Sequence, residues 1–318
     1  MNRKLRGNLM LILTALIWGT SFVAQKSGMD VIGPLAFNGI RTLIGGIVLV
    51  PAIKLMNRSK ADNNKDGEMP DAQQKTPEQK KEEKRTLLIG GICCGTALMA
   101  AGNLQQIGLL YTTAGKAGFI TALYVVIVPI LGLFLKRKTR PLIWICVIAS
   151  AAGLYLLCIP QGGGFGHLNK GDLMMPVCAL LFAVHIMVID HFSPKTDGVK
   201  LSCVQFFVAG ILSLMFLWID PLLGFALPTL HTLAAAWFPI MYAGAISCGI
   251  AYTFQVIAQK DTDPTIASMI LCLESVFAVL AGMVLLGESM SLREIIGCLI
   301  MFAAIGAAQL PEKKERLL

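Results

Sequence analysis

The sequence predicts an all-α polytopic membrane protein whose ten transmembrane helices form a 5+5 inverted repeat, with both termini in the cytoplasm. Three observations carry this prediction: an apolar composition, ten apolar blocks and an internal repeat. Of the 318 residues, 55% are hydrophobic and 14% are charged, and the mean hydropathy is +0.69. A soluble domain carries roughly 25% charged residues. We therefore expect lipid to be the outer solvent of this chain.

Apolar blocks long enough to cross a bilayer recur ten times along the chain. Each has about 20 residues, the length that a helix needs to span roughly 30 Å of hydrocarbon. Because backbone groups in lipid need partners within their own segment, we expect helices. The alternation typical of a β-barrel strand is not seen. The expected spans are 8–26, 34–54, 87–109, 113–135, 141–159, 171–190, 199–219, 234–258, 264–287 and 291–310.

Two segments between and before these blocks need their own explanation. The basic residues 1–7 resemble the start of a signal peptide, but more apolar blocks follow, so we expect an uncleaved first span. The connection 57–85 is rich in charged and amide residues and has no hydrophobic period, which predicts a disordered cytoplasmic loop. Pro129 and Pro239 interrupt the fourth and eighth blocks and are expected either to act as hinges or to kink these helices statically.

Lys and Arg residues are distributed as in a membrane protein with its N-terminus inside. That orientation assigns 22 of the 27 Lys and Arg residues to the cytoplasmic side and only Lys26, Lys170 and Arg293 to the outside. The net charge of +8 is therefore a topology signal, and we expect no nucleic-acid partner. The nine cysteines lie in apolar blocks without a zinc spacing, so they are interpreted as apolar packing residues.

An internal repeat becomes visible when the chain is shifted by 150 positions. Residues 101–145 and 251–295 then share 12 identities in 45 ungapped positions, of which Gln105/Gln255 weighs more than the Leu and Ile matches. The chain is thus expected to consist of two five-helix halves.

The expected halves are 1–159, which includes the polar loop, and 160–318. Because five is odd, the second half would enter the membrane upside down relative to the first. Inverted repeats of this kind build a binding site near the bilayer midplane that can open to either side. The repeat therefore indicates a transporter.

Short motifs also occur in a characteristic order along the chain. They are Trp18-Gly19 in the first span, Phe37-x-x-x-Arg41 in the second, and Gly287-Glu288, Gly297 and Gly306 in and after the ninth. Together with the ten blocks and the repeat, they resemble the EamA-like family of the drug/metabolite transporter superfamily. The resemblance covers nearly the whole chain apart from the 57–85 loop. The first half departs from it, because Arg137-Lys138 stands where the second half has Gly287-Glu288.

The resemblance implies a 5+5 fold with a central cavity in the plasma or inner membrane. It implies a secondary transporter for small polar or amphipathic metabolites, such as amino acids or related compounds, and mostly export. The expected partners are a small-molecule substrate and the lipid bilayer, while proton coupling and a homodimer stay open. A lipid flippase, or a membrane-embedded enzyme or receptor, is the alternative. The sequence has no Walker, H-E-x-x-H or G-x-S-x-G motif, so we expect neither an enzyme nor a cofactor or metal site.

Glu274 is the first candidate for substrate binding and for coupling. It lies near the middle of the ninth span, where an ionised carboxylate costs roughly 2.5–3.5 kcal/mol on insertion scales. A carboxyl group there would face a cavity and bind a proton or a substrate ammonium group, or else form a structural ion pair with Arg41 or Lys116. Its repeat equivalent is Tyr124, which we also include in the site.

Arg41 and a set of neutral polar residues complete the predicted site. Arg41 would hold a substrate carboxylate or phosphate, or would serve as a packing anchor, and Lys116 is expected to extend to the membrane surface. The neutral residues would line a polar cavity or hydrogen-bond between helices, and His185 is expected to be a packing residue. The neutral candidates are Trp18, Ser21 and Gln25 in the first span, Asn38, Asn103 and Gln106 in the second and third, and Tyr252, Gln255 and Gln259 in the eighth.

Overall fold

Helices make up all of the regular structure in this computed structural model, which describes residues 3–63, 76–111, 114–159, 170–286 and 291–310. No strand occurs in these residues. Eight of the helical segments are long and apolar enough to cross a membrane. The all-helical membrane fold predicted from the sequence is therefore confirmed.

The helices follow one another along the chain with short connections. The first half contains α1 (Arg3–Met29), α2 (Pro34–Asn63), α3 (Pro77–Leu109), α4 (Ala114–Ala122), α5 (Tyr124–Phe134) and α6 (Pro141–Cys158). The second half contains α7 (Lys170–Phe192), η1 (Ser193–Lys195), α8 (Gly198–Met215), α9 (Ile219–Leu222), α10 (Leu230–Ala235), α11 (Trp237–Met241), η2 (Tyr242–Tyr252), α12 (Thr253–Gln259), α13 (Pro264–Leu271), α14 (Glu274–Leu286) and α15 (Leu292–Ala308). Pro34, Pro77, Pro141 and Pro264 each begin a helix, where a missing N–H costs nothing.

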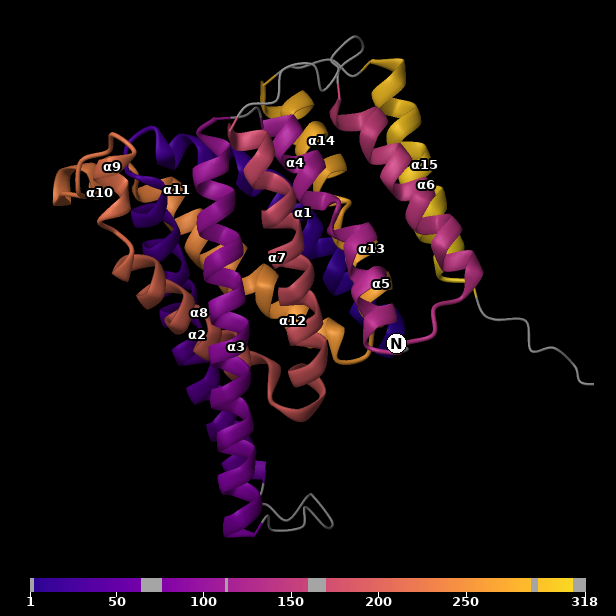
Figure 1. The fold of residues 1–318 in the computed structure, drawn as a ribbon. Coiled ribbons are helices and arrows are strands. Elements are labelled where there is room, and N and C mark those ends of the chain that lie inside the picture. The colour runs from indigo at the N-terminus through magenta and orange to yellow at the C-terminus, as the bar shows by residue number, and fades with distance from the viewer. Residues whose placement is uncertain (1–2, 64–75, 112–113, 160–169, 287–290, 311–318) are drawn as a thin grey trace, which may run out of the picture.

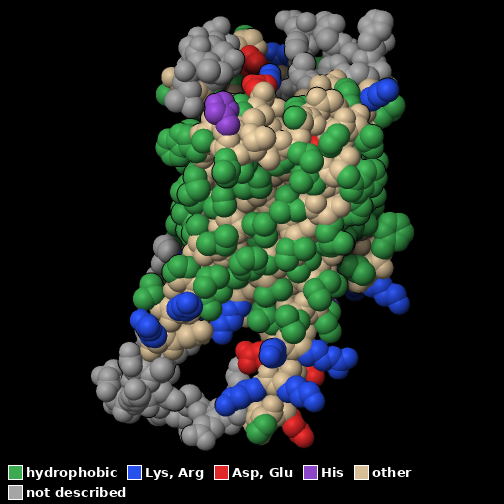
Figure 2. All heavy atoms as spheres, turned by 90° about the vertical axis from the view of Figure 1, so that its left-hand side faces the viewer, with side chains coloured by type: hydrophobic (Ala, Val, Ile, Leu, Met, Phe, Trp, Pro, Cys, Tyr) green, Lys and Arg blue, Asp and Glu red, His purple; other side chains and the backbone are tan. Residues whose placement is uncertain are grey.

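The outer surface is apolar over most of its height. Figure 2 shows a broad band of hydrophobic side chains on one face, with Lys and Arg side chains gathered beyond its lower edge. Large apolar side chains such as Ile145, Val177 and Leu299 are more than half exposed. A soluble protein would not present so much apolar surface, whereas lipid covers it without cost. This surface identifies the bundle as one that lies within a membrane.

The segment predicted to be a disordered loop, 57–85, is helical at both ends. α2 continues to Asn63 and α3 already begins at Pro77, while 64–75 lie outside the described residues. Thr76 and Gln79 form a capping box at the start of α3, with hydrogen bonds of 2.9 and 3.2 Å. The residues that follow are mainly Glu, Lys and Gln, which favour helix. A helix surrounded by water needs no hydrophobic period, which is why the sequence pattern was misleading.

The fourth and ninth predicted spans are each divided in two by a break at an equivalent position. Leu123 separates α4 from α5, and Cys272 and Leu273 separate α13 from α14. Leu123 N–H donates to Ile120 O at 3.2 Å, and Leu273 N–H donates to Ile270 O at the same distance. These two bonds are 150 residues apart, the offset of the sequence repeat. Both breaks are therefore tight turns with the same hydrogen bond between residues i+3 and i.

α6 and α15 lie side by side along one edge of the bundle in Figure 1. They cross at glycines: a Cβ on Gly153 would lie 2.7 Å from Gly297 O, and one on Gly297 would lie 2.6 Å from Gly153 O. The backbones meet because neither residue has a side chain, as in other close helix pairs in membranes. α15 has 17 residues and is about 26 Å long, and the apolar part of α6 is similarly short.

The described ends of the chain lie at the same end of the bundle. Asn8 Nδ2 in α1 donates to Gln309 Oε1 at 3.0 Å. Arg140, which precedes α6, donates to the carbonyl of Leu310 at 3.2 Å. We call this the N-terminal end of the bundle.

The eighth predicted span is built from α11, η2 and α12, and η2 is an 11-residue π-helix. Side chains of α1 bond to its carbonyl groups: Thr14 Oγ1 donates to Ala251 O at 2.9 Å, and Trp18 Nε1 donates to Ser247 O at 3.4 Å. π-Helical turns are rare and occur often at functional sites. Pro239 lies in α11, just before this segment, whereas Pro129 lies within the continuous helix α5.

Candidate functional site

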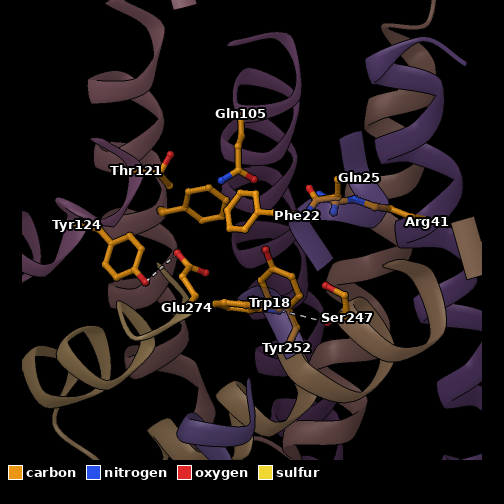
Figure 3. A pocket seen from close by; sticks show the side chains of 11 residues that line it. Trp18, Phe22, Gln25, Arg41, Gln105, Thr121, Tyr124, Ser247, Tyr252 and Glu274 are labelled. Atoms are coloured by element: carbon orange, nitrogen blue, oxygen red, sulfur yellow. Dashed lines mark hydrogen bonds between the residues drawn. The ribbon is translucent and has the colours of Figure 1, made fainter. Parts of the chain in front are cut away.

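A pocket lies in the core of the bundle, between helices of both halves. The cavity has a volume of about 30 Å³, room for about two water molecules, so the pocket is nearly closed in this structure. Figure 3 shows Glu274 and Arg41 on opposite sides of it, with aromatic rings between them. The lining residues are Trp18, Phe22 and Gln25 of α1, Arg41 of α2, Gln105 of α3, Thr121 and Tyr124 of α4 and α5, Phe182 of α7, Ser247 and Tyr252 of η2, and Glu274 of α14.

Glu274 begins α14, directly after the break in the ninth span. Its side chain is buried, and Tyr124 Oη donates to its Oε1 at 3.4 Å. Tyr124 begins α5 directly after the break in the fourth span, so the two breaks bring their following residues together. On the other side of Glu274, its backbone packs against Gly19 of α1, where a Cβ would lie 2.6 Å from Glu274 O. Gly19 thus lets α1 approach the carboxylate-bearing helix.

Arg41 is held in place by a polar network behind the pocket wall. Its Nε donates to Asn38 Oδ1 at 3.0 Å, and its guanidinium lies 5.8 Å from the centre of the Phe37 ring. Asn38 Nδ2 donates to Asn103 Oδ1 at 2.7 Å and to Ser213 Oγ at 3.3 Å. This network joins α2, α3 and α8. The network fixes the guanidinium through its Nε atom alone. The two Nη groups of Arg41 make no hydrogen bond to Asn38.

Two ionisable side chains, Arg41 and Glu274, face the pocket from opposite sides (Figure 3). Within the residues that the structure describes, no ion pair joins Arg41 to Glu274. The side chain of Lys116, the other predicted partner of Glu274, lies outside the described residues. A buried guanidinium and a buried carboxylate therefore face the same pocket, where an isolated charge is costly.

Gln25 is positioned by two other predicted residues. Gln106 of α3 donates to Gln25 Oε1, and Gln25 Nε2 donates to Ser21 Oγ at 3.4 Å. Gln106 and Ser21 are fully buried and lie behind Gln25. Only Gln25 of the three lines the pocket.

Aromatic rings form the wall between the two charges. The Trp18 and Tyr252 rings lie 4.4 Å apart with their planes tilted by 52°. Phe22 and Phe182 also line the pocket. Rings of this kind give a pocket an apolar surface that still accepts the edge of a polar solute or a cationic group.

Six of the twelve predicted site residues line this pocket. They are Trp18, Gln25, Arg41, Tyr124, Tyr252 and Glu274. Ser21, Asn38, Asn103 and Gln106 are hydrogen-bonded behind the wall and position Gln25 or Arg41. Gln255 and Gln259 are buried and do not line the pocket. A role in substrate binding stays a prediction for each of these residues.

Five lining residues were missed from the sequence. Phe22 follows Trp18 by four positions, so helical spacing could have found it. Gln105 is the repeat equivalent of Gln255, and the structure brings Gln105 instead to the pocket. Thr121, Phe182 and Ser247 carry no signal that separates them from the many similar residues of an apolar bundle.

Other sequence features lie apart from the pocket. Gly287 and Glu288 fall outside the described residues. Arg137, their counterpart in the first half, forms an ion pair with Asp190 near the N-terminal end of the bundle. No group of three or more metal-ligating side chains occurs in the part of the chain that the structure describes.

A helical bundle with an apolar girdle and a polar pocket enclosed by both halves has the architecture of a multi-pass membrane transporter. The family model described as the EamA-like transporter family matches residues 5–159 and 169–308. The chain therefore belongs to the EamA-like transporter family, and the family resemblance noted from the sequence is confirmed. Its place is the cell membrane, as a multi-pass protein.

Similar proteins agree with this assignment. An "Uncharacterized transporter" of Archaeoglobus fulgidus is 29% identical over 309 residues, which cover 95% of this chain and 85% of that protein. The "Uncharacterized inner membrane transporter YedA" of Escherichia coli is 23% identical over 295 residues, covering 91% and 86%. A solved crystal structure matches with a TM-score of 0.71 at 18% identity, covers 95% of this chain and 96% of its own, and supports the fold alone. These names describe transporters, not enzymes.

Proposed function

We propose that this protein is a secondary transporter that exports small zwitterionic metabolites, such as amino acids or related compounds, by alternating access. The observation that carries the proposal is that a buried guanidinium, Arg41, and a buried carboxyl group, Glu274, line one pocket without forming an ion pair with each other. A zwitterion would satisfy both, with its carboxylate on Arg41 and its ammonium group on Glu274. Its apolar part would lie against Trp18 and Tyr252.

The other side chains of the pocket support a small polar solute. Gln25, Gln105, Thr121 and Ser247 offer amides and hydroxyls that can bond to a polar backbone or hydroxyl group.

The proposed topology is ten spans in two inverted halves, 1–159 and 160–318, with both termini cytoplasmic. It is supported by the breaks at Leu123 and Leu273, which recur at the offset of the sequence repeat. Helix ends recur at the same offset, since α3 ends at Leu109 and α12 at Gln259. An even number of spans agrees with the Asn8–Gln309 hydrogen bond between the two ends. The Lys and Arg bias supports the orientation.

Glu274 is also the residue that we propose for proton coupling. A carboxyl group in the pocket can hold either a proton or the ammonium group of the substrate, but not both at once. Exchange of the two at one site would link substrate release to proton uptake. Export is the direction that the family resemblance favours.

The test is transport by the purified full chain in liposomes, with radiolabelled zwitterions, organic cations and organic anions of similar size. Each solute is measured with and without a pH gradient, for the wild type, Glu274→Gln and Arg41→Gln. We expect the wild type to accumulate zwitterions. Glu274→Gln is expected to lose gradient-driven accumulation, and Arg41→Gln to lose selectivity for the carboxylate. Inside-out and right-side-out vesicles give the direction.

Other outcomes would contradict the proposal in specific ways. Equal transport by the wild type and Glu274→Gln, with and without the gradient, would make Glu274 structural and the protein a facilitator. Movement of a fluorescent phospholipid, without movement of any solute in the panel, would favour a lipid flippase.

A further inference from the structure

A second group of polar side chains lies between the pocket and the N-terminal end of the bundle. We call it the α7–α8–α12 polar cluster. Its members are His185 of α7, Ser202 and Gln205 of α8, and Gln255 and Gln259 of α12. None of the five residues is more than 1% exposed. They are uncharged or weakly basic groups buried at membrane depth.

The cluster begins where the pocket ends, at Tyr252. The Tyr252 ring lines the pocket, and its centre lies 6.0 Å from the centre of the His185 ring. His185 Nε2 in turn lies 3.2 Å from Gln205 Oε1, which joins α7 to α8. The two contacts of His185 described here, with Tyr252 and with Gln205, involve no charged side chain. The cluster is therefore in contact with the pocket lining through Tyr252.

The remaining members lead from Tyr252 toward the N-terminal end of the bundle. Gln255 and Gln259 follow Tyr252 by about one and two turns of α12, on the same side of the helix. Gln259 Nε2 donates to Ile186 O of α7 at 3.1 Å. Ser202 lies one turn before Phe206, whose ring centre is 6.0 Å from that of Tyr252. The end of α12 at Gln259 and the start of α8 at Gly198 lie toward the N-terminal end of the bundle (Figure 1), so the cluster residues on these helices follow one another toward that end.

The cluster holds more hydrogen-bonding groups than protein partners. Ser202 Oγ, Gln205 Nε2, Gln255 Oε1 and Gln259 Oε1 are buried without a hydrogen-bond partner among the described side chains and backbone. A buried polar atom in this state destabilises the conformation that contains it, and packing alone would favour apolar residues at these positions. Polar side chains are favoured at these positions if another conformation of the protein exposes them to water.

We propose that the α7–α8–α12 polar cluster is the closed half of the transport route, and that it opens to water and passes the solute between the pocket and the N-terminal end of the bundle. This inference rests on the proposed function. The cluster presents amide, hydroxyl and imidazole groups without a carboxylate or an ammonium group. It therefore suits a solute of no net charge that moves with water, and it would hold a free ion only weakly.

The first test measures hydration with a matched pair of serines. Ser202 and Ser150 are both 0% exposed, and both have a hydroxyl without a partner among the described residues, but Ser150 lies in α6, away from the cluster. Ser202→Cys and Ser150→Cys are placed in the full chain in liposomes and treated with N-ethylmaleimide. Mass spectrometry of peptides separates the new thiol from the native cysteines. We expect Ser202→Cys to react about tenfold faster or more.

The second test measures transport and stability together. Gln255→Met and Ser202→Ala remove unpartnered groups, so both should raise the melting temperature of the closed state. They should also lower the initial rate of zwitterion transport about tenfold. Each substitution removes the desolvation cost of one buried polar group from the closed state, so the closed state becomes more populated relative to the open state. Ser150→Ala should raise the melting temperature and leave the rate unchanged.

The outcomes separate this inference from the proposed function. Transport by the wild type with unreactive Ser202→Cys and normal rates for Gln255→Met and Ser202→Ala would overturn the route and leave the transporter intact. Equal reactivity of Ser202→Cys and Ser150→Cys would also overturn it. Selective reaction of Ser202→Cys, in a protein that moves no solute of the panel, would contradict both the proposed function and the cluster as a substrate route.

Discussion

Tyr124 and Glu274, 150 residues apart in the chain, occupy equivalent positions in the sequence repeat and touch each other through a hydrogen bond of 3.4 Å. Each is the first residue of a helix that follows a tight turn. Two carboxylates at these positions would repel each other. One phenol and one carboxylate instead form a donor–acceptor pair.

Removal of this hydroxyl should weaken the site without abolishing it. Tyr124→Phe keeps the ring and removes the donor to Glu274. A net hydrogen bond contributes about 0.5–1.5 kcal/mol, so we expect a roughly fivefold higher KM for the zwitterion in the liposome assay. Tyr155→Phe, on the exposed side of α6, is the control and should keep the wild-type KM. An unchanged KM in Tyr124→Phe would mean that this contact has no part in substrate binding.

The network behind Arg41 should contribute to both stability and binding. Asn38→Leu keeps the approximate volume but leaves Arg41 Nε, Asn103 Oδ1 and Ser213 without their bonds to Asn38. We expect a loss of about 1–3 kcal/mol in the free energy of unfolding and weaker binding of the substrate carboxylate. Differential scanning fluorimetry in detergent and the KM of transport measure the two effects. Ser268→Ala, which loses only a bond within α13, should change neither by a comparable amount.

The close approach of α1 to α14 makes Gly19 sensitive to substitution. A Cβ there would lie 2.6 Å from Glu274 O and 2.7 Å from Ala278 N. Gly19→Ala should therefore separate the two helices, destabilise the protein by about 1–3 kcal/mol and reduce transport. Gly306→Ala is a matched control, since Gly306 is also helical and has no heavy atom within 4 Å of the added Cβ. A melting temperature that rises for both variants would contradict the packing described for α1 and α14.

Asp220 should give the bundle a pH-dependent stability outside the membrane spans. Its carboxylate accepts the N–H groups of Leu35 and Ala36, at 3.0 and 2.9 Å, and so caps α2 from a distant part of the chain. Burial raises the pKa of Asp220 above its ordinary value of 3.8, and the two N–H donors offset only part of this rise. The folded state then binds a proton more tightly than the unfolded state does.

Stability of the wild type should therefore fall as the pH rises from 3.8 through the raised pKa of Asp220. Asp220→Asn cannot ionise and should not show this fall. Melting temperatures of the two proteins at pH about 4 to 7 measure the difference, which should move in favour of the variant with rising pH. A constant difference across this range would show that the carboxyl group does not titrate with folding.

The membrane class and the family follow from the sequence because composition and block length leave little choice. The breaks in the fourth and ninth spans could not be predicted, since Leu123 and Cys272-Leu273 contain no Gly or Pro. The helical ends of the 57–85 segment were missed because a water-exposed helix has no apolar period. The capping residue Thr76 was the available signal.

The composition of the pocket was predictable only in part. Arg41 and Glu274 stand out because charges within apolar blocks are rare. Which amides face the pocket depends on how each helix is rotated, and helices that are apolar on nearly all sides do not specify their rotation. Gln105 and Gln255 are equivalent in the repeat, yet only Gln105 reaches the pocket.

The first turns of α3 have a practical consequence for imaging. A chain of 34.2 kDa lies almost entirely within a detergent micelle and gives electron cryomicroscopy little to align. α3 extends past the neighbouring helices (Figure 1), and its residues 77–85 are exposed and begin at a capping box. An antibody fragment that binds residues 77–85 would serve as a fiducial for particle alignment. It would be rigidly connected, through α3, to the pocket residue Gln105.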